Sequence, residues 1–147
     1  MLLLETCLSV ASLTALDMTD IVLASNRLLV HLAWVGDVWL GMGKAHQPVE
    51  EYIDEGRLNL LHKPGEPALF ISQMDGRLSR QGVWQILKYW GLQAEPAIPL
   101  SPRLVRHTAA LRMMNAGMNS AGIQKRLGHR NLLSTQALLR RLKASCD

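Results

Sequence analysis

Apolar residues recur at roughly helical spacing over most of the chain. Between Leu2 and Leu16 they predict one helix, which ends at the polar residues 17–20. Pro48 suits the first turn of a second helix, and the acidic residues that follow it suit the positive end of the helix dipole. Serine or asparagine caps and glycine stops predict the remaining helices. The expected helices are 2–16, 48–61, 80–91, 102–117, 120–128 and 132–144.

A different pattern occupies residues 21–42, where β-branched and aromatic residues are frequent. Segments 28–35 and 38–42 predict two strands joined by a turn at Gly36 and Asp37, because this pair tolerates positive φ. Residues 21–23 are a candidate third strand, and residues 68–72 read as a short strand. The expected fold class is mainly α with a small antiparallel β-sheet (α+β). A hydrophobic content of 48% is enough for one core, so residues 1–147 are expected to form a single domain.

Charge is distributed unevenly along the chain. The formal net charge is +4, but residues 1–100 hold 7 Lys/Arg against 11 Asp/Glu, whereas residues 101–147 hold 9 Lys/Arg against one acid. A basic cluster of this density attracts polyanions, which makes nucleic acid or an anionic membrane surface the leading class of partner. The alternative is an ordinary solvated helix face.

Composition argues against several other kinds of site. Cys7 and Cys146 lie at opposite ends of the chain, and the five histidines lack metal-ligand spacing, so we expect no metal site, cofactor or disulfide. The apolar N-terminus has no basic start and contains Glu5, which favours a buried helix over a signal peptide. No run of 18 uncharged apolar residues occurs, so no membrane span is expected and a cytoplasmic location is the default.

Residues 99–143 are the most informative segment. They contain LSPRLVRHTAA, then NAGMNSAGIQKRLGH, then STQ. This order resembles the C-terminal half of the catalytic domain of tyrosine recombinases (phage integrases and Xer-type resolvases), in which S-P-H-x-L-R-H is followed by L-G-H and S-T-x-x-Y. Segments 6–23, 28–41 and 76–92 parallel the T-G-L-R opening, the hairpin and the mid-domain helix of that family. The resemblance implies a catalytic domain alone, without the N-terminal core-binding domain.

The resemblance also implies roles for individual residues. In the family a tyrosine attacks the scissile phosphodiester, two arginines clamp the phosphate, a hairpin lysine protonates the leaving oxygen, and histidines assist without a metal. Arg106 falls on the second clamp arginine and His129 on the histidine of L-G-H. The hairpin has Trp34 near the place of the lysine, and Lys44 lies after the second strand. Arginine suits the clamp because its planar fork donates two parallel hydrogen bonds and keeps its charge.

Three positions of the family frame carry different residues. Ser9 replaces the first clamp arginine, Arg103 replaces the histidine three residues before Arg106, and Leu138 replaces the attacking tyrosine. A leucine has no proton or lone pair to offer, so no covalent cleavage by this route is expected. The sequence therefore predicts a catalytically inactive, DNA-binding recombinase relative, an accessory or regulatory factor in DNA recombination or integration of a mobile element.

The candidate phosphate contacts lie in the basic part of the chain. Arg103 and Arg106 are three residues apart on one helix, so both are predicted to reach the same backbone phosphate of double-stranded DNA. His129 either donates to a phosphate or hydrogen-bonds a helix end. His107 reads as a partly buried structural histidine, and the four tryptophans as fillers of the core or of a groove. Further side chains predicted to follow the duplex backbone are Lys125, Arg126, Arg130, Arg140 and Arg141.

Two other functions remain open at this stage. The C-terminal helix has a possible docking stripe of Leu132, Leu139 and Leu142, which would let the chain pair with an active recombinase or with itself. Residues 120–142 also resemble a helix-turn-helix with Gly128 in the turn, which would place residues 131–136 in a major groove and give sequence-specific binding.

Overall fold

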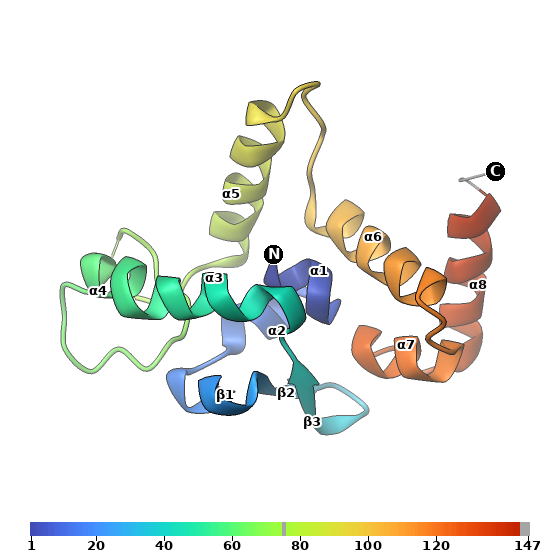
Figure 1. The fold of residues 1–147 in the computed structure, drawn as a ribbon, viewed down its shortest axis with the longest axis horizontal. Helices are drawn as coiled ribbons and strands as arrows, with labels where there is room; N and C mark the ends of the chain where they lie inside the picture. The colour runs from blue at the N-terminus through green and yellow to red at the C-terminus, as the bar shows by residue number, and fades with distance from the viewer. Residues whose placement is uncertain (75, 145–147) are drawn as a thin grey trace.

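The fold is mostly helical and contains one small antiparallel sheet (Figure 1). The computed structural model describes residues 1–74 and 76–144. Strands β1 (Ile21–Val22), β2 (Arg27–Leu32) and β3 (Gly36–Gly41) pair in the order β1-β2-β3. The predicted fold class and the third strand are confirmed. Cys146 lies outside the described residues.

The hairpin turn lies before the two residues that the sequence predicts for it. β2 and β3 pair with Leu32 opposite Gly36, so residues 33–35 make the turn, and Gly36 already opens β3. Trp34 has a φ of 70°, a conformation that a bulky residue rarely adopts, and Gly36 follows with a φ of 84°. The expected turn at Gly36 and Asp37 is therefore wrong. The glycine does supply a positive φ, but at the first residue of the returning strand.

The N-terminal helix is broken in two, which contradicts the prediction of one helix over residues 2–16. α1 (Leu2–Thr6) ends at Cys7, which adopts a left-handed conformation with φ 62°. α2 (Val10–Ala15) starts anew behind Ser9, whose hydroxyl accepts a hydrogen bond from the backbone N–H of Ser12 at 3.0 Å. The break lets the fully buried Cys7 side chain reach α6, where its thiol donates to the Arg106 carbonyl at 3.5 Å.

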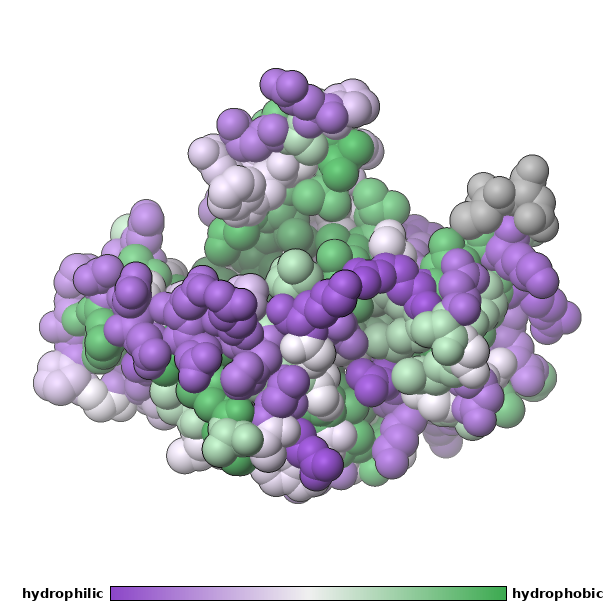
Figure 2. Space-filling model, viewed as in Figure 1, coloured by the Kyte–Doolittle hydropathy of each residue, from purple (hydrophilic) through white to green (hydrophobic). Residues whose placement is uncertain are grey.

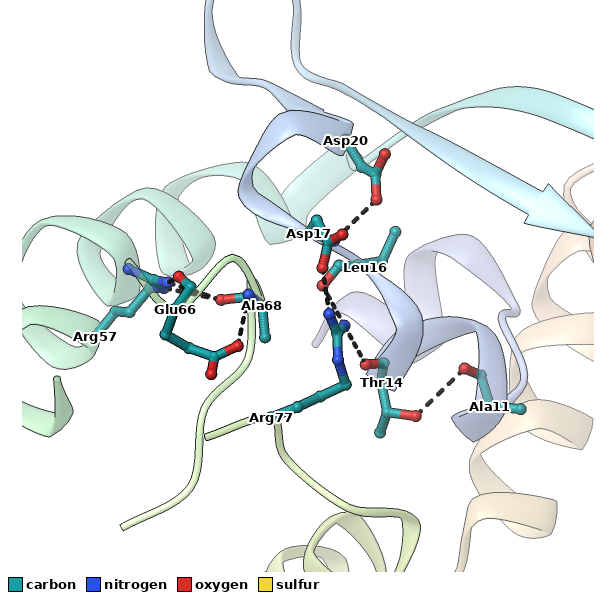
Figure 3. Close-up of polar contacts among 9 residues, drawn as sticks. All are labelled: Ala11, Thr14, Leu16, Asp17, Asp20, Arg57, Glu66, Ala68 and Arg77. Atoms are coloured by element: carbon teal, nitrogen blue, oxygen red, sulfur yellow. Dashed lines mark hydrogen bonds and ion pairs between the residues drawn. The ribbon is translucent and has the colours of Figure 1, made fainter. Parts of the chain in front are cut away.

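The helix predicted over residues 48–61 is irregular. α3 (His46–Glu51) passes through a π-helical turn (Tyr52–Gly56) into α4 (Arg57–Leu60). In the loop that follows, residues 68–72 make only isolated bridges, so the strand predicted there is wrong. Arg57 and Arg77 tie this loop down instead, as Figure 3 shows.

These two arginines act by donating to backbone carbonyls. Arg57 is buried, and its guanidinium donates to the carbonyls of Ala68 (3.1 and 2.8 Å) and Glu66 (2.6 Å). Arg77 donates to the carbonyls of Thr14 (2.9 Å) and Leu16 (3.2 Å) and also pairs with the carboxylate of Asp17. The loop is thereby fastened to α2 and to the end of the α3–α4 segment without a strand of its own.

Helix α5 (Arg80–Gln93) stands away from the rest of the molecule and is joined to α6 by the proline-rich connector (Figure 1). Ser79 caps it as predicted, but Gly91 does not end it. Gly91 is buried because the connector passes directly over it: a Cβ there would lie 2.3 Å from the Ile98 carbonyl oxygen. The glycine is needed for close backbone approach, which local sequence cannot distinguish from a helix stop.

The three C-terminal helices follow the predicted boundaries closely. α6 (Pro102–Asn115) is capped by Ser101, α7 (Ser120–Leu127) by Asn119, and α8 is Leu132–Ala144. Gly128 ends α7 in the left-handed conformation with φ 62°. Each of these capping and stop residues acts within one helix turn, so the sequence alone is enough to place the ends of these helices.

Two hydrophobic clusters meet at α1. The first gathers apolar side chains from α1, α2, the sheet and α3, and the second joins α6, α7 and α8. Leu2 belongs to the first cluster and Cys7 to the second, so α1 packs into both. Within the described residues, every helix is too short or too polar to span a bilayer. The contact of α1 with α6 places residues from both ends of the sequence around one cavity.

Candidate functional site

Five positions of the family frame line a single cavity of about 230 Å³ between α1, α2, α6 and α8. They are Ser9, Arg103, Arg106, His129 and Leu138, and they come from four separate stretches of the chain. The described lining also includes His107 and contains no acidic side chain. The predicted constellation is thus assembled around one space whose charged groups are all basic.

Arg103 and Arg106 project from the same face of α6 into this cavity. Arg103 is exposed, whereas Arg106 is half-buried and donates from its Nη2 to the Leu127 carbonyl at the end of α7. The Nε of Arg106 is buried and has no hydrogen-bond partner among the described residues. An unpaired buried donor of this kind costs about 1–3 kcal/mol.

His129 follows Gly128 and is held by its neighbours. Its Nδ1 lies 2.9 Å from the hydroxyl of Thr135, a fully buried residue of α8, and its carbonyl accepts from the Gln124 amide at 3.1 Å. Burial, reinforced by the Arg106 charge, lowers the pKa of His129 below the ordinary value of 6.5. His129 is therefore neutral at pH 7 and can donate one ring proton, from Nδ1 if the Thr135 hydroxyl accepts and from Nε2 if that hydroxyl donates.

His107 is a residue of the cavity that the sequence analysis treated as structural. It lies next to Arg106 in the chain and lines the same space. Burial, and next the neighbouring charges of Arg103 and Arg141, lower its pKa. The signal was present in the family pattern quoted above, where a histidine directly follows the clamp arginine, but periodicity alone gave no reason to separate it from the apolar residues around it.

Ser9 and Leu138, which replace the first clamp arginine and the attacking tyrosine of the family pattern, have structural roles. The Ser9 hydroxyl caps α2 and lies 2.9 Å from the Ser12 hydroxyl. Leu138 is only 8% exposed and belongs to the second hydrophobic cluster. Ser9 supplies no cation to the cavity, and Leu138 supplies no hydroxyl.

Most of the other predicted phosphate contacts lie outside the cavity lining. Lys125 is exposed on α7, and Arg126 is turned toward α1, where it donates to the Glu5 carbonyl at 3.5 Å. Arg140 lines a separate groove, of about 520 Å³, between α7 and α8. Arg141 is exposed, and its charge acts on His107. The cavity itself therefore brings together only part of the basic set.

Arg130 has a partner that the sequence did not suggest. Its guanidinium lies 4.9 Å from the centre of the Trp34 ring at the hairpin tip. Such a cation–π contact contributes about 0.5–1 kcal/mol at an exposed site. It places the hairpin turn beside the loop that carries His129.

None of the four tryptophans is buried in the core, contrary to one of the two expected placements. Trp34, Trp39, Trp84 and Trp90 are between 46% and 72% exposed. Trp84 packs against Lys88, whose Nζ lies 5.2 Å from the ring centre, and only Trp90 lines a groove. The core is built from aliphatic side chains instead.

The predicted docking stripe on the C-terminal helix is mostly used inside the chain. Leu139 is buried in the second hydrophobic cluster and Leu142 packs against it, which leaves Leu132 at 36% exposure. This face of α8 packs on α6 and α7, so the prediction of a free docking surface there is wrong.

No group of three or more His, Cys, Asp or Glu side chains arranged to hold a metal ion occurs in residues 1–74 and 76–144. Cys7 is buried, and burial raises the pKa of its thiol, so it stays protonated at neutral pH. The polar side chains that line the cavity are the guanidinium groups of Arg103 and Arg106, the imidazoles of His107 and His129, and the Ser9 hydroxyl. Guanidinium and imidazole donors suit an anionic ligand.

Comparison with known protein families decides the relationship. The family described as the phage integrase family matches residues 1–143, nearly the whole chain. The chain belongs to the phage integrase family. Among curated tyrosine recombinases of this family, XerC of Herpetosiphon aurantiacus is 34% identical over 135 residues, covering 91% of this chain and 44% of the relative. XerC of Bacillus subtilis is 32% identical over 138 residues, covering 92% and 45%.

Solved structures support the same fold. The XerA recombinase superposes with a TM-score of 0.80 at 23% identity, covering 98% of this chain and 55% of that one. The Tn1549 transposon integrase, in complex with transposon right end DNA, gives 0.75 at 21% identity, covering 98% and 56%. The chain spans less than half the length of these curated relatives. The family resemblance read from the sequence is confirmed.

Proposed function

We propose that this chain is a catalytically inactive member of the phage integrase family that binds DNA through a backbone phosphate and serves as an accessory or regulatory factor in DNA recombination or integration of a mobile element. The observation that carries the proposal is the shared cavity. Arg103, Arg106 and His129 face it together with Leu138, which stands where the family has its nucleophile. The site thus offers donors for an anion but no tyrosine to attack one, and the Ser9 hydroxyl in its lining is engaged with Ser12 as the cap of α2.

Electrostatics support an anionic ligand. Two arginines share one face of α6, and the described lining of the cavity has no acid. A phosphate diester can accept from several of these donors at once. Structural neighbours of this fold are recombinases bound to DNA, which makes a backbone phosphate of double-stranded DNA the best-supported ligand.

The proposal is tested by DNA binding at several salt concentrations, with Arg103→Ala/Arg106→Ala compared to the parent chain. Arg103 and Arg106 are proposed to contact the same phosphate, and each neutralised phosphate contributes about 0.9 to the slope of log affinity against log salt, so the double variant should lose about 0.9 from the slope. Over a fourfold change in salt, its affinity should then vary about 3.5-fold less than that of the parent.

A matched control removes the same charge elsewhere. Arg27 and Arg80 are exposed in the acidic front part of the chain, so Arg27→Ala/Arg80→Ala changes the net charge equally but leaves the cavity intact. We expect this control to keep the parent's salt slope. Loss of affinity in both double variants, or in neither, would show that net charge or some other surface governs binding.

Inactivity has its own test. A nicked duplex traps a covalent protein–DNA link if a nucleophile attacks, so we expect no adduct from the parent chain under conditions where it binds. Formation of an adduct would overturn the inactive part of the proposal while leaving DNA binding in place.

A second candidate is sequence-specific binding by α7 and α8 as a helix-turn-helix. The observation in its favour is the left-handed Gly128 between two helices that pack on each other, with Ser134 exposed at the start of the second. If α7 and α8 bind as a helix-turn-helix, Ser134→Ala/Gln136→Ala should relax the preference for particular DNA sequences. If the chain binds only through a backbone phosphate, the double variant should leave that preference unchanged. Pairing with an active recombinase through α8 is disfavoured, because Leu139 and Leu142 are occupied within the chain.

A further inference from the structure

The phosphate cavity, which Arg103, Arg106 and His129 line, is contacted by a buried residue outside its lining. The hydroxyl of Thr135 lies 2.9 Å from Nδ1 of His129, and Thr135 is 0% exposed. Thr135 belongs to α8, which packs on α6 and α7 and stands on the other side of α6 from α5 (Figure 1). The contact therefore lies apart from the hydrophobic surface on and below the standing α5 helix (Figure 2).

The other threonines of the described α-helices use their hydroxyls differently. Thr6, Thr14 and Thr108 each donate to a backbone carbonyl three or four residues earlier in the same helix, at distances of 2.8, 3.3 and 2.9 Å. This is the usual bond of a helical threonine. The hydroxyl of Thr135 makes no such bond, and its one hydrogen-bond partner among the described residues is His129. Thr135 thus serves the histidine ring rather than its own helix.

Burial decides which atom of this pair donates. If Nδ1 of His129 carried the ring proton and donated it, the hydroxyl hydrogen of Thr135 would be buried without an acceptor among the described residues. An unpaired buried donor is the costly arrangement. If the hydroxyl donates instead, its hydrogen is paired and only oxygen lone pairs stay unused. The second arrangement is the more stable one, and it places the proton of the neutral ring on Nε2.

The Nε2 atom of His129 is the ring nitrogen that a ligand can reach. It makes no hydrogen bond to a described residue, and it is not among the described buried atoms that lack a partner, so it is open to the cavity that His129 lines. The backbone of His129 is fixed as well. Its N–H donates to the Gln124 carbonyl at 3.2 Å, and its carbonyl accepts from the Gln124 amide at 3.1 Å. With the backbone and Nδ1 both held, the ring keeps one orientation.

The position of the ring proton matters to an anion. Burial, reinforced by the Arg106 charge, lowers the pKa of His129, so the ring is neutral at pH 7 and carries a single proton. A proton on Nε2 gives the cavity a hydrogen-bond donor, whereas a proton on Nδ1 would leave a lone pair on Nε2, which repels a phosphate oxygen.

We propose that Thr135 is a positioning residue of the phosphate cavity: its hydroxyl donates to Nδ1 of His129 and holds the ring in the form whose Nε2–H donates to a backbone phosphate of DNA. The inference rests on the proposed function for the identity of the ligand. The state of the ring, however, is a property of the free chain and is measured without DNA.

Nitrogen NMR of the free 147-residue chain at neutral pH observes the ring directly, because a protonated and a bare ring nitrogen differ in chemical shift. The His129 signals are those missing from His129→Ala. We expect a protonated Nε2 and a bare, hydrogen-bonded Nδ1 in the parent and in Thr135→Ser, which keeps a hydroxyl. In Thr135→Val, which keeps the shape alone, the Nδ1 signal should move toward that of a nitrogen without a donor. A proton on Nδ1 in the parent would mean that Thr135 accepts, and the inference would be wrong.

Affinity for duplex DNA measures the consequence of losing the hydroxyl. Thr135→Val should weaken binding about three- to tenfold, because the ring is no longer held, and Thr135→Ser should weaken it less than about twofold. The matched control is Thr6→Val. Thr6 is equally buried, its hydroxyl donates to the Leu2 carbonyl, and it is not part of the cavity lining. This control should change affinity less than about twofold. Melting temperatures establish that each variant is folded at the assay temperature.

A role through His129 also predicts that the two residues are coupled. In the His129→Ala background, Thr135→Val should weaken DNA binding less than about twofold further, because the ring that the hydroxyl positions is gone. Equal losses with and without His129, or equal losses in Thr135→Val and Thr6→Val, would make Thr135 a structural residue only and overturn the inference. Absence of DNA binding by a parent chain whose ring is protonated on Nε2 would refute the proposed function and still confirm that Thr135 sets the ring proton.

Discussion

Restoring a tyrosine at position 138 tests whether the phosphate cavity is a disabled recombinase site. Leu138 is 8% exposed and borders a cavity of about 230 Å³, so Leu138→Tyr should be accommodated near the lower end of the usual overpacking cost of about 1–3 kcal/mol. Ser9→Arg would return the first clamp arginine to the same cavity. It removes the hydroxyl that caps α2, which costs about 0.5–2 kcal/mol.

The two substitutions should differ sharply in their effect on chemistry. One missing donor to a developing negative charge costs about 100- to 1,000-fold in rate. Leu138→Tyr alone has a nucleophile but only Arg106 of the clamp pair, so we expect it to form little or no covalent adduct. Ser9→Arg/Leu138→Tyr should form adduct about 100 times faster or more.

The assay is adduct formation on a nicked duplex, followed by denaturing electrophoresis, with DNA binding and melting temperature measured for each variant. Ala137→Tyr with Ser9→Arg is the matched control, because Ala137 is exposed on the same helix and is not part of the cavity lining. This control should give no adduct.

Two outcomes would refute the reasoning. If Leu138→Tyr alone reacts as fast as the double variant, the missing clamp arginine is not what disables the site. If the double variant folds and binds DNA but forms no adduct, the cavity does not have the geometry of a recombinase site. In the first case the missing tyrosine alone would account for the proposed inactivity of the parent chain. In the second case the proposed inactivity would need another cause.

Three further predictions concern stability. Gly91→Ala should destabilise the fold by about 1–3 kcal/mol in denaturant titration, because the new Cβ would lie 2.3 Å from the Ile98 carbonyl oxygen; an unchanged midpoint would contradict the close approach. Arg57→Met should cost about 2–4 kcal/mol by leaving carbonyls such as that of Ala68 without their donor, and Arg57→Lys should cost less. The lowered pKa of His129 means that the unfolded chain binds more protons than the folded one. The free energy of unfolding should therefore fall as the pH drops below about 6.5, and His129→Gln should weaken that dependence.

Local signals in the sequence were enough for the C-terminal half of the fold. Ser101, Asn119 and Gly128 cap or end their helices as predicted, since a cap depends on hydrogen bonds within one turn. The spacing from Arg106 to Leu138 likewise placed the candidate site residues, because it reflects the order of helices that this family shares.

Other features depend on contacts between distant segments. Gly91 looks like a helix stop until the connector is seen to cross it, and the hairpin turn moves because the pairing of β2 with β3 places Gly36 in a strand. The exposed tryptophans were misjudged for the same reason, since exposure is set by what the rest of the chain covers. His107 is partly buried, as predicted, but only the tertiary structure shows that it lines the cavity.

The sequence by itself determined the family, the helical C-terminal half and the residue types that a phosphate would meet, because these follow from short-range hydrogen bonding and from residue order. Only the tertiary structure decided that the first helix breaks at Cys7. The break is tied to burial of the thiol against the Arg106 carbonyl, a contact between residues 99 positions apart. That long-range contact brings Ser9 and Leu138 to one cavity, which no local pattern encodes.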